Sequence, residues 1–79
     1  MSEDDIILES LAELNEDSTV PKNIKLKIEE IKNLLKSDSE KSMKLSKIHQ
    51  MLDEIGDDPN IEAYTRTQIW NIVSLLENI

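Results

Sequence analysis

The sequence predicts an all-α protein, a four-helix bundle built from two repeated helical hairpins with an approximate internal twofold. Two observations support this fold class. Residues Leu11 to Leu35 reappear, in altered form, at Leu52 to Leu76 when the chain is shifted by 41 positions against itself. A period near forty residues is typical of one helical hairpin used twice. The 79 residues also include only one glycine and two prolines, which argues against a turn-rich β fold.

The apolar positions of the two copies coincide. The matching pairs are Leu11 and Leu52, Leu14 and Ile55, Val20 and Ile61, Ile28 and Ile69, Ile31 and Ile72, Leu34 and Leu75, and Leu35 and Leu76. Each hairpin alone would expose an apolar face, so we expect the two to pack together and close a bundle. The chain is thus expected to form one domain over residues 1–79, with hairpins over about 3–36 and 39–79.

The first helix is expected over residues 3–15. Ser2 is a plausible N-cap, and three acidic residues follow it, where negative charge interacts favourably with the helix dipole. The apolar stripe of this helix consists of Ile7, Leu8, Leu11 and Leu14.

The second helix is expected over residues 20–36. Either Thr19 or Val20 is expected at the cap, with Pro21 in the first turn, where its missing N–H costs nothing. The apolar residues Val20, Ile24, Ile28, Ile31 and Leu35 fall within a narrow arc at about 100° per residue.

The third helix is expected over residues 39–55. Ser37 and Glu40 have the spacing of a capping box, and Ser39 is a competing cap. Gly56 is the only glycine, and it follows the last apolar residue of this helix. A glycine at that place predicts a left-handed residue that ends the helix.

The fourth helix is expected to begin near Pro59 or Ile61, capped by Asp58 or Asn60, and to continue to the end of the chain. Its apolar residues spread over more than half of its circumference, whereas a helix at the edge of a bundle needs an arc of about 100° or a little more. Either this helix is central in the monomer, or a second copy covers it. The candidate interface residues are Tyr64, Trp70, Val73 and Ile79.

Trp70 has two interpretations that the sequence leaves open. Tryptophan is often an interface anchor, and it is as often a core residue with its N–H at the rim. Tyr64 and Trp70 are the only aromatic residues of the chain.

The net charge of −8 hides a basic middle segment. All eight lysines lie between Lys22 and Lys47, with only four carboxylates among them, so this third carries +4. A lysine stripe across adjacent helices is able to follow a phosphate backbone, although no aromatic residue interleaves it for base stacking. The candidate basic surface consists of Lys22, Lys25, Lys32 and Lys36. The plainer interpretation is a solvated face partly neutralised by carboxylates.

Nothing in the sequence supports an enzyme, a cofactor or a metal site. His49 and Asp53 stand one turn apart, but no nucleophile accompanies them, and a half-buried boundary histidine is the favoured interpretation. The acidic pairs 16–17 and 57–58 lack the alternating carboxylates and central glycine of a calcium loop. We expect these carboxylates to interact with the N–H groups at the start of the following helix.

No segment is expected to enter a membrane or direct export. The longest apolar runs are three residues, against about 20 for a transmembrane helix. The first residues, MSEDD, are acidic where a secretion signal is basic. A cytoplasmic location is therefore expected.

Three strings, TVPKNI, DEIGDDPNI and RTQIWNIVSLLE, together resemble the small archaeal proteins grouped as uncharacterised protein family 0147. The resemblance covers the chain from about Leu11 onward, and the string from Arg66 to Glu77 is its most specific part. It implies a compact four-helix bundle, an archaeal cytoplasmic source and no established activity. It implies no catalytic, cofactor-binding or metal-binding residue.

The function expected from these observations is a non-catalytic helical module for protein–protein interaction or self-association, with a protein partner or a second copy. The alternative is a nucleic-acid or ribosome-associated accessory protein that uses the lysines of the second and third helices.

Overall fold

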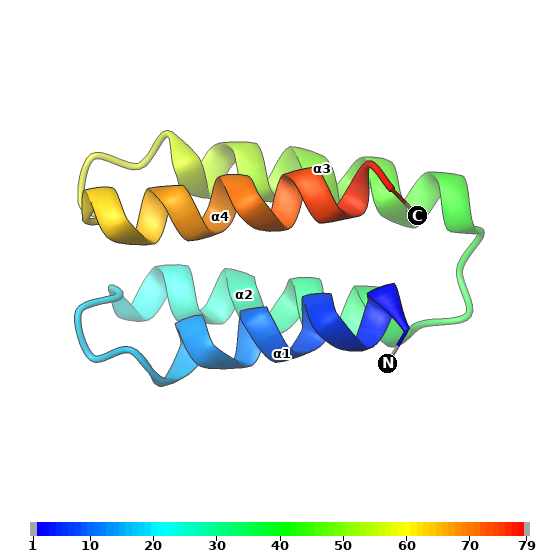
Figure 1. The fold of residues 1–79 in the computed structure, drawn as a ribbon, viewed down its shortest axis with the longest axis horizontal. Helices are drawn as coiled ribbons and strands as arrows, with labels where there is room; N and C mark the ends of the chain where they lie inside the picture. The colour runs from blue at the N-terminus through cyan, green and yellow to red at the C-terminus, as the bar shows by residue number, and fades with distance from the viewer. Residues whose placement is uncertain (1, 79) are drawn as a thin grey trace.

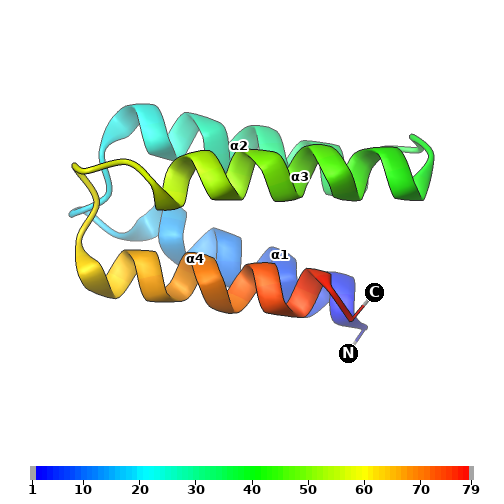
Figure 2. The ribbon, with the colours of Figure 1, turned by 90° about the horizontal axis from the view of Figure 1, so that it is seen from above.

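The computed structural model describes residues 2–78, which form four antiparallel helices in chain order: α1 (Glu3–Glu16), α2 (Lys22–Lys36), α3 (Lys41–Gly56) and α4 (Ala63–Leu76). The helices lie side by side in a square arrangement (Figure 1). Each helix packs against two neighbours, α1 against α2 and α4, and α3 against α2 and α4. Seen from above, α2 lies beside α3 and α4 beside α1, with both chain ends at the same end of the bundle (Figure 2). The predicted all-α, four-helix fold is confirmed.

The core is aliphatic and runs along the bundle axis. Each helix contributes residues spaced three or four apart, which is the spacing that puts apolar side chains on one helical face. The buried apolar residues are Ile7, Leu11, Leu14, Val20, Ile24, Ile28, Ile31, Leu35, Ile48, Met51, Leu52, Ile55, Ile61, Ile69, Ile72 and Leu76. No aromatic side chain of the described residues lies among them.

The pattern of buried residues in the first hairpin recurs in the second, as the sequence repeat does. Residues 41 positions apart are buried together in eight pairs: Ile7 and Ile48, Leu11 and Leu52, Leu14 and Ile55, Val20 and Ile61, Ile24 and Thr65, Ile28 and Ile69, Ile31 and Ile72, and Leu35 and Leu76. The turns within the hairpins also match. Asp17 Oδ1 accepts a hydrogen bond from Thr19 N at 2.9 Å, and Asp58 Oδ1 accepts one from Asn60 N at 2.8 Å. The two hairpins therefore use equivalent residues in equivalent ways, and their predicted twofold relation stays a prediction.

The start of α1 is the one N-cap that the sequence located. Ser2 accepts a hydrogen bond from Asp5 N through its Oγ at 3.2 Å. The predicted cap of α2 at Thr19 or Val20 is wrong, because α2 begins at Lys22 with Pro21 as its N-cap residue. The Thr19 hydroxyl is instead held by the Asp17 carboxylate at 2.7 Å.

The predicted capping box of α3 is also wrong. The helix begins at Lys41, and Glu40 precedes it without a side-chain cap. Ser37 serves the preceding helix, since its Oγ donates to Leu34 O at 2.7 Å, in the last turn of α2. The backbone N–H of Ser37 donates to the same carbonyl oxygen at 3.1 Å, so Ser37 caps the end of α2 through both its hydroxyl and its backbone.

Two further boundaries differ from the prediction. Gly56 is the last residue of α3, and no glycine has a positive φ among the described residues, so the expected left-handed cap is absent there. The fourth helix begins at Ala63, not near Pro59 or Ile61, and Glu62 is its N-cap residue. The carboxylate of Asp58 is bound within the turn, to Asn60 N, and is therefore not available as a cap.

The fourth helix is not central. It packs against α1 and α3 only, as each other helix packs against two neighbours. Its wide apolar arc is therefore not fully covered by the bundle, and part of it remains at the surface.

Candidate interaction surface

The outward side of α4 carries no charged residue among its exposed positions. These exposed positions, which we call the α4 face, are Ala63, Tyr64, Thr67, Trp70, Asn71 and Ser74. The chain as a whole is 33% charged, so an uncharged helix surface is unusual for it. By contrast, the exposed residues of α1 are six carboxylates and one isoleucine: Glu3, Asp4, Asp5, Ile6, Glu9, Glu13 and Glu16.

Trp70 lies at the surface, where it packs across α3. The residue is 61% exposed to solvent. Its Nε1 lies 3.4 Å from the position that a Cβ on Gly56 would occupy, so the indole rests against the end of α3. Because Gly56 has no side chain, the large indole ring is able to lie close to the backbone there. In the monomer, Trp70 is therefore a surface residue and not part of the core.

Tyr64 is the second exposed aromatic residue of the α4 face, at 66% exposure. Its hydroxyl accepts a hydrogen bond from Gln68 Nε2 at 3.0 Å, one turn further along the helix. This contact holds the phenol against the helix surface while its ring stays open to solvent. The bond also leaves the hydroxyl free to donate to a partner group.

The other two candidate interface residues differ from these. Val73 is half-buried and packs against the core, so it borders the α4 face without belonging to it. Ile79 lies outside the described residues. The structure thus brings Tyr64 and Trp70 onto one exposed helix side.

The first hairpin provides an internal comparison for Trp70. The equivalent position, 41 residues earlier, is Glu29, which is also exposed. A bundle of this shape therefore accepts a charged residue at the place where α4 has tryptophan. Likewise, Asn23 occupies the position equivalent to Tyr64. The aromatic residues are accordingly not needed to complete the bundle.

Arg66 holds the end of α3 beside this surface. Its Nε donates to Gly56 O at 2.8 Å and its Nη2 to Asp58 O at 3.1 Å. A cation at a helix C-terminus satisfies free carbonyl groups and interacts favourably with the helix dipole. This role of Arg66 was not predicted from the sequence. The only signal for it was a basic residue at the same repeat position, Lys25, in the first hairpin.

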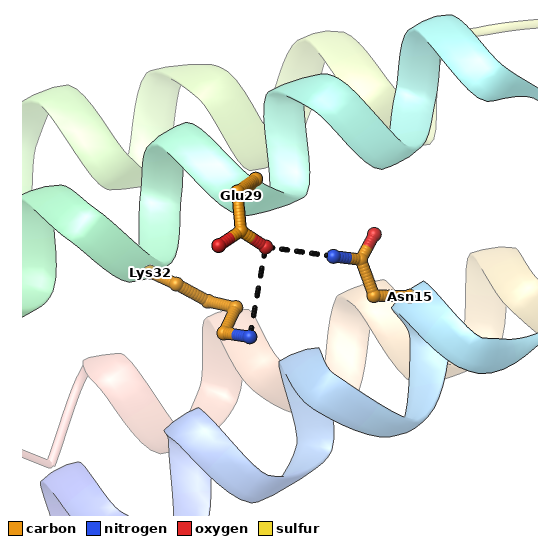
Figure 3. A network of polar contacts seen from close by, with 3 residues as sticks. All are labelled: Asn15, Glu29 and Lys32. Atoms are coloured by element: carbon orange, nitrogen blue, oxygen red, sulfur yellow. Dashed lines mark hydrogen bonds and ion pairs between the residues drawn. The ribbon is translucent and has the colours of Figure 1, made fainter.

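The lysines of the candidate basic surface do not form an open stripe. Lys22 and Lys36 are exposed, but Lys25 and Lys32 are half-buried. Lys32 Nζ lies 3.6 Å from Glu29 Oε2, and the same carboxylate oxygen accepts a hydrogen bond from Asn15 Nδ2 at 2.9 Å (Figure 3). The Glu29 carboxylate therefore lies among the lysines of α2 and pairs with Lys32.

Lys44 of α3 is also engaged. Its Nζ donates to Leu35 O and to Ser37 O, both at 3.0 Å. The ammonium group thus satisfies carbonyl groups at the end of α2, as Arg66 does at the end of α3. The charge of Lys44 therefore stabilises the connection between α2 and α3.

The candidate chemical groups are at the surface. His49 Nδ1 lies 3.5 Å from Asp53 Oδ2, with side-chain exposures of 42% and 61%. The acidic pairs bind backbone groups of their own turns, through Asp17 and Asp58, and not the helix N-termini that we expected. Among residues 2–78, no three His, Cys, Asp or Glu side chains come together as a metal site. No helix in this part of the chain is long and apolar enough to cross a membrane.

These features define a class of all-α four-helix proteins in which two similar hairpins pack around an aliphatic core. Residues 4–79 match the model of the Uncharacterised protein family (UPF0147). The chain belongs to this family, as its sequence strings indicated, and the family has no assigned function. The predicted family membership is confirmed.

Relatives and solved structures agree with this placement. The chain is 44% identical over 70 residues to the UPF0147 protein MJ1419 of Methanocaldococcus jannaschii, covering 87% of this chain and 75% of that protein. It is 38% identical over 73 residues to a UPF0147 protein of Archaeoglobus fulgidus, covering 92% and 84%.

Two crystal structures have the same fold. The unknown function protein MMP1188 has a TM-score of 0.88 and 42% identity, covering 98% of this chain and 89% of that one. A UPF0147 protein of Thermoplasma acidophilum has a TM-score of 0.87 and 35% identity, covering 94% and 88%. The fold is therefore shared across the family at moderate sequence identity.

Proposed function

We propose that this protein is a non-catalytic helical module that binds protein through the α4 face. The observation that carries the proposal is the exposure of Trp70 and Tyr64, at 61% and 66%, on a helix side without charged residues. Interface cores are depleted of charge and enriched in tyrosine and tryptophan, and these two residue types dominate binding energy in many interfaces.

The internal comparison with the first hairpin supports the proposal. Eight pairs of equivalent positions are buried in both halves, yet the exposed positions differ in chemistry. The first hairpin has Glu29 and Asn23 where the second has Trp70 and Tyr64. Packing of the bundle does not account for the aromatic residues, because the first hairpin packs without them. Leaving two large rings in water disfavours the free chain, and covering them with a partner removes that cost.

The geometry of Trp70 also suits binding. The indole rests against Gly56, and Arg66 fixes the backbone at Gly56 and Asp58. A ring held in this way loses little conformational freedom when a partner covers it, and preorganisation of this kind increases affinity.

The nucleic-acid alternative has less support. Phosphate binding requires cations that are free to approach a backbone. Lys32 is paired with Glu29, and Lys44 is bound to carbonyl groups of the α2–α3 connection. The proposal includes a non-enzymatic role and the expected cytoplasmic location, which fractionation of the source cell with a specific antibody tests.

Replacement of one exposed residue tests the proposal. Trp70→Glu places at this position the residue type that occupies the equivalent site in α2, so the fold is expected to persist. The matched control is Leu26→Glu, since Leu26 is 62% exposed on α2 and the change is chemically similar. The tagged wild-type chain and both variants are used to recover stoichiometric protein partners from the source cell, with cross-linking of the purified chain in parallel.

Each result has a clear meaning. A protein bound by the wild type and the Leu26 variant but lost with the Trp70 variant supports the proposal, whether it is a different protein or another copy. Equal recovery with all three chains would place the binding surface elsewhere and reject the α4 face. Circular dichroism of each variant shows whether its helices are intact.

A further inference from the structure

We propose that the partner covering the α4 face is a second copy of this chain, with the two α4 helices packed against each other around a twofold axis. This inference rests on the proposed function and specifies its partner. The charge of the chain, the shape of the α4 face and the area that a dimer requires all bear on this arrangement.

Charge restricts where two copies are able to meet. Each carries a net charge of −8, so close approach is opposed by repulsion over most of the surface. A twofold contact places the same surface of both copies face to face. Such a contact through α1 would oppose its six exposed carboxylates to six others. The exposed residues of α2 and α3 include charges of both signs, from Lys22 and Glu30 on α2 to Lys47 and Glu54 on α3.

The α4 face avoids this repulsion. From Ala63 to Ser74 its exposed residues are all uncharged, and the nearby Arg66 is already bound to Gly56 and Asp58 carbonyl groups. Among the four helices, α4 is the one whose exposed positions carry no charge. The nearest exposed carboxylates along the chain, Glu62 and Glu77, lie just beyond its two ends. Its outer side is also left open by the neighbouring helices (Figure 2).

The shape of the α4 face is suited to a helix of the same kind. At about 100° per residue, Tyr64 and Trp70 lie about 120° apart around the helix. Ala63, Thr67, Asn71 and Ser74 fall in the arc between them. Because these uncharged side chains are shorter than the two aromatic ones, we expect the α4 of another copy to approach them to the usual interaxial distance of about 8–10 Å.

The area available to the contact limits its stability. A stable interface buries roughly 800 Å² on each partner, about a sixth of the 4921 Å² surface of this chain. A helix of 14 residues is only about 21 Å long, so the α4 face alone is small. The contact must extend into the neighbouring α1–α4 groove, which Ser10, Glu13, Gln68, Asn71, Ile72 and Leu75 line. Glu13 brings one carboxylate of α1 to the edge of the contact, and repulsion between the two copies of it weakens the dimer. We therefore expect a weak dimer with a dissociation constant in the micromolar range.

The chain has one tryptophan, which makes the contact directly measurable. Sedimentation equilibrium over the micromolar range is expected to give a monomer–dimer equilibrium. Over the same range, the emission of Trp70 is expected to shift to shorter wavelength and its quenching by acrylamide to decrease, because the indole becomes covered. A chain that stays monomeric, with emission independent of concentration, would overturn the proposal.

Variants locate the contact. Trp70→Glu is expected to weaken the dimer by about 30-fold or more, the fold-change for losing an interface hot spot. Leu26→Glu is expected to leave it unchanged. If the dimer persists in the Trp70 variant, another face forms it, and the proposal is wrong.

Single cysteines provide a second test that does not depend on weakening the dimer. The chain has no native cysteine, so each variant has a unique thiol. Thr67 lies at the middle of the α4 face, and its equivalent on α2 is Leu26. Thr67→Cys is expected to be joined into dimers by a short thiol-reactive linker, and Leu26→Cys is not. Equal linkage of the two variants would contradict the α4–α4 arrangement.

These results separate this inference from the proposed function. A strictly monomeric chain that still recovers a different protein, with recovery lost in the Trp70 variant, would reject the second copy and leave protein binding through the α4 face in place. A strictly monomeric chain that recovers no protein, or only proteins that the Trp70 variant recovers equally well, would reject both the second copy and protein binding through the α4 face.

Discussion

The indole of Trp70 lies against Gly56, with Nε1 3.4 Å from the position that a Cβ at residue 56 would occupy. This glycine was expected to end α3 in the left-handed region, but it is helical and no positive φ is required of it. Its value is therefore space beside the ring, and not backbone freedom.

Replacing this glycine by alanine is expected to stabilise the fold. Gly56→Ala removes conformational freedom from the unfolded chain, and the new methyl group reaches the indole at ordinary contact distance. We expect a gain of about 0.5–1 kcal/mol in the free energy of unfolding, measured by urea denaturation.

A larger residue is expected to act differently. Gly56→Leu has no room beside the indole and should displace it, which changes the emission of the single tryptophan. A loss of more than about 1 kcal/mol for the alanine variant would show that glycine is needed for the backbone after all.

Trp70 is expected to contribute little to the stability of the monomer. Because it is 61% exposed, Trp70→Ala should cost about 1 kcal/mol, whereas Ile69→Ala, at a residue that is fully buried, should cost about 2–5 kcal/mol. Urea denaturation at a concentration that keeps the chain monomeric, followed by circular dichroism, measures both costs. Similar costs at the two positions would mean that the ring is part of the core.

Arg66 is expected to stabilise the end of α3. Arg66→Ala removes the hydrogen bonds to Gly56 O and Asp58 O and should cost about 1–2 kcal/mol. Arg66→Lys keeps the charge but not the forked geometry and should recover only part of this loss.

The matched control for Arg66 is Lys25→Ala, in the equivalent turn of the first hairpin. Lys25 makes no hydrogen bond to the end of α1 among the described contacts, so its replacement should change the stability by less than about 0.5 kcal/mol. Hydrogen exchange at the last amides of α3 should increase in the arginine variant alone. Unchanged exchange there would contradict the capping role.

The Asp17 turn is expected to make stability depend on pH. The hydroxyl of Thr19, with help from its backbone N–H, holds the pKa of the Asp17 carboxyl below its ordinary value of 3.8. Folding therefore favours the ionised form. The resulting stabilisation is fully present above that ordinary value and is lost as the pH falls through the lower pKa of the folded state.

Removing the hydroxyl tests this dependence. Thr19→Val deletes the stronger of the two hydrogen bonds to the carboxylate and should raise the pKa of Asp17 toward its ordinary value. The pKa is measured by NMR titration of the side-chain carboxyl carbon, and stability by urea denaturation at several acidic pH values. If the variant and the wild type lose stability in the same way on acidification, this turn is not the cause.

Apolar spacing predicted the number of helices and most residues of the core. The spacing of three and four residues is a local property of the chain, and most residues of the predicted stripes are buried, as at Ile28 and Ile69, whereas Tyr64 and Trp70 are exposed. The repeat strengthened the prediction because the same buried positions occur twice.

The tertiary structure alone decided where α2, α3 and α4 begin and which side of α4 remains exposed. Pro21, Glu40 and Glu62 precede their helices without side-chain caps, because the polar groups that seemed to be caps are bound within the turns. Trp70 lies at the edge of an apolar arc, and such a position becomes core or surface according to where the neighbouring helix lies. That placement depends on contacts between distant segments, such as the one between Trp70 and Gly56, and periodicity along one helix carries no information about them.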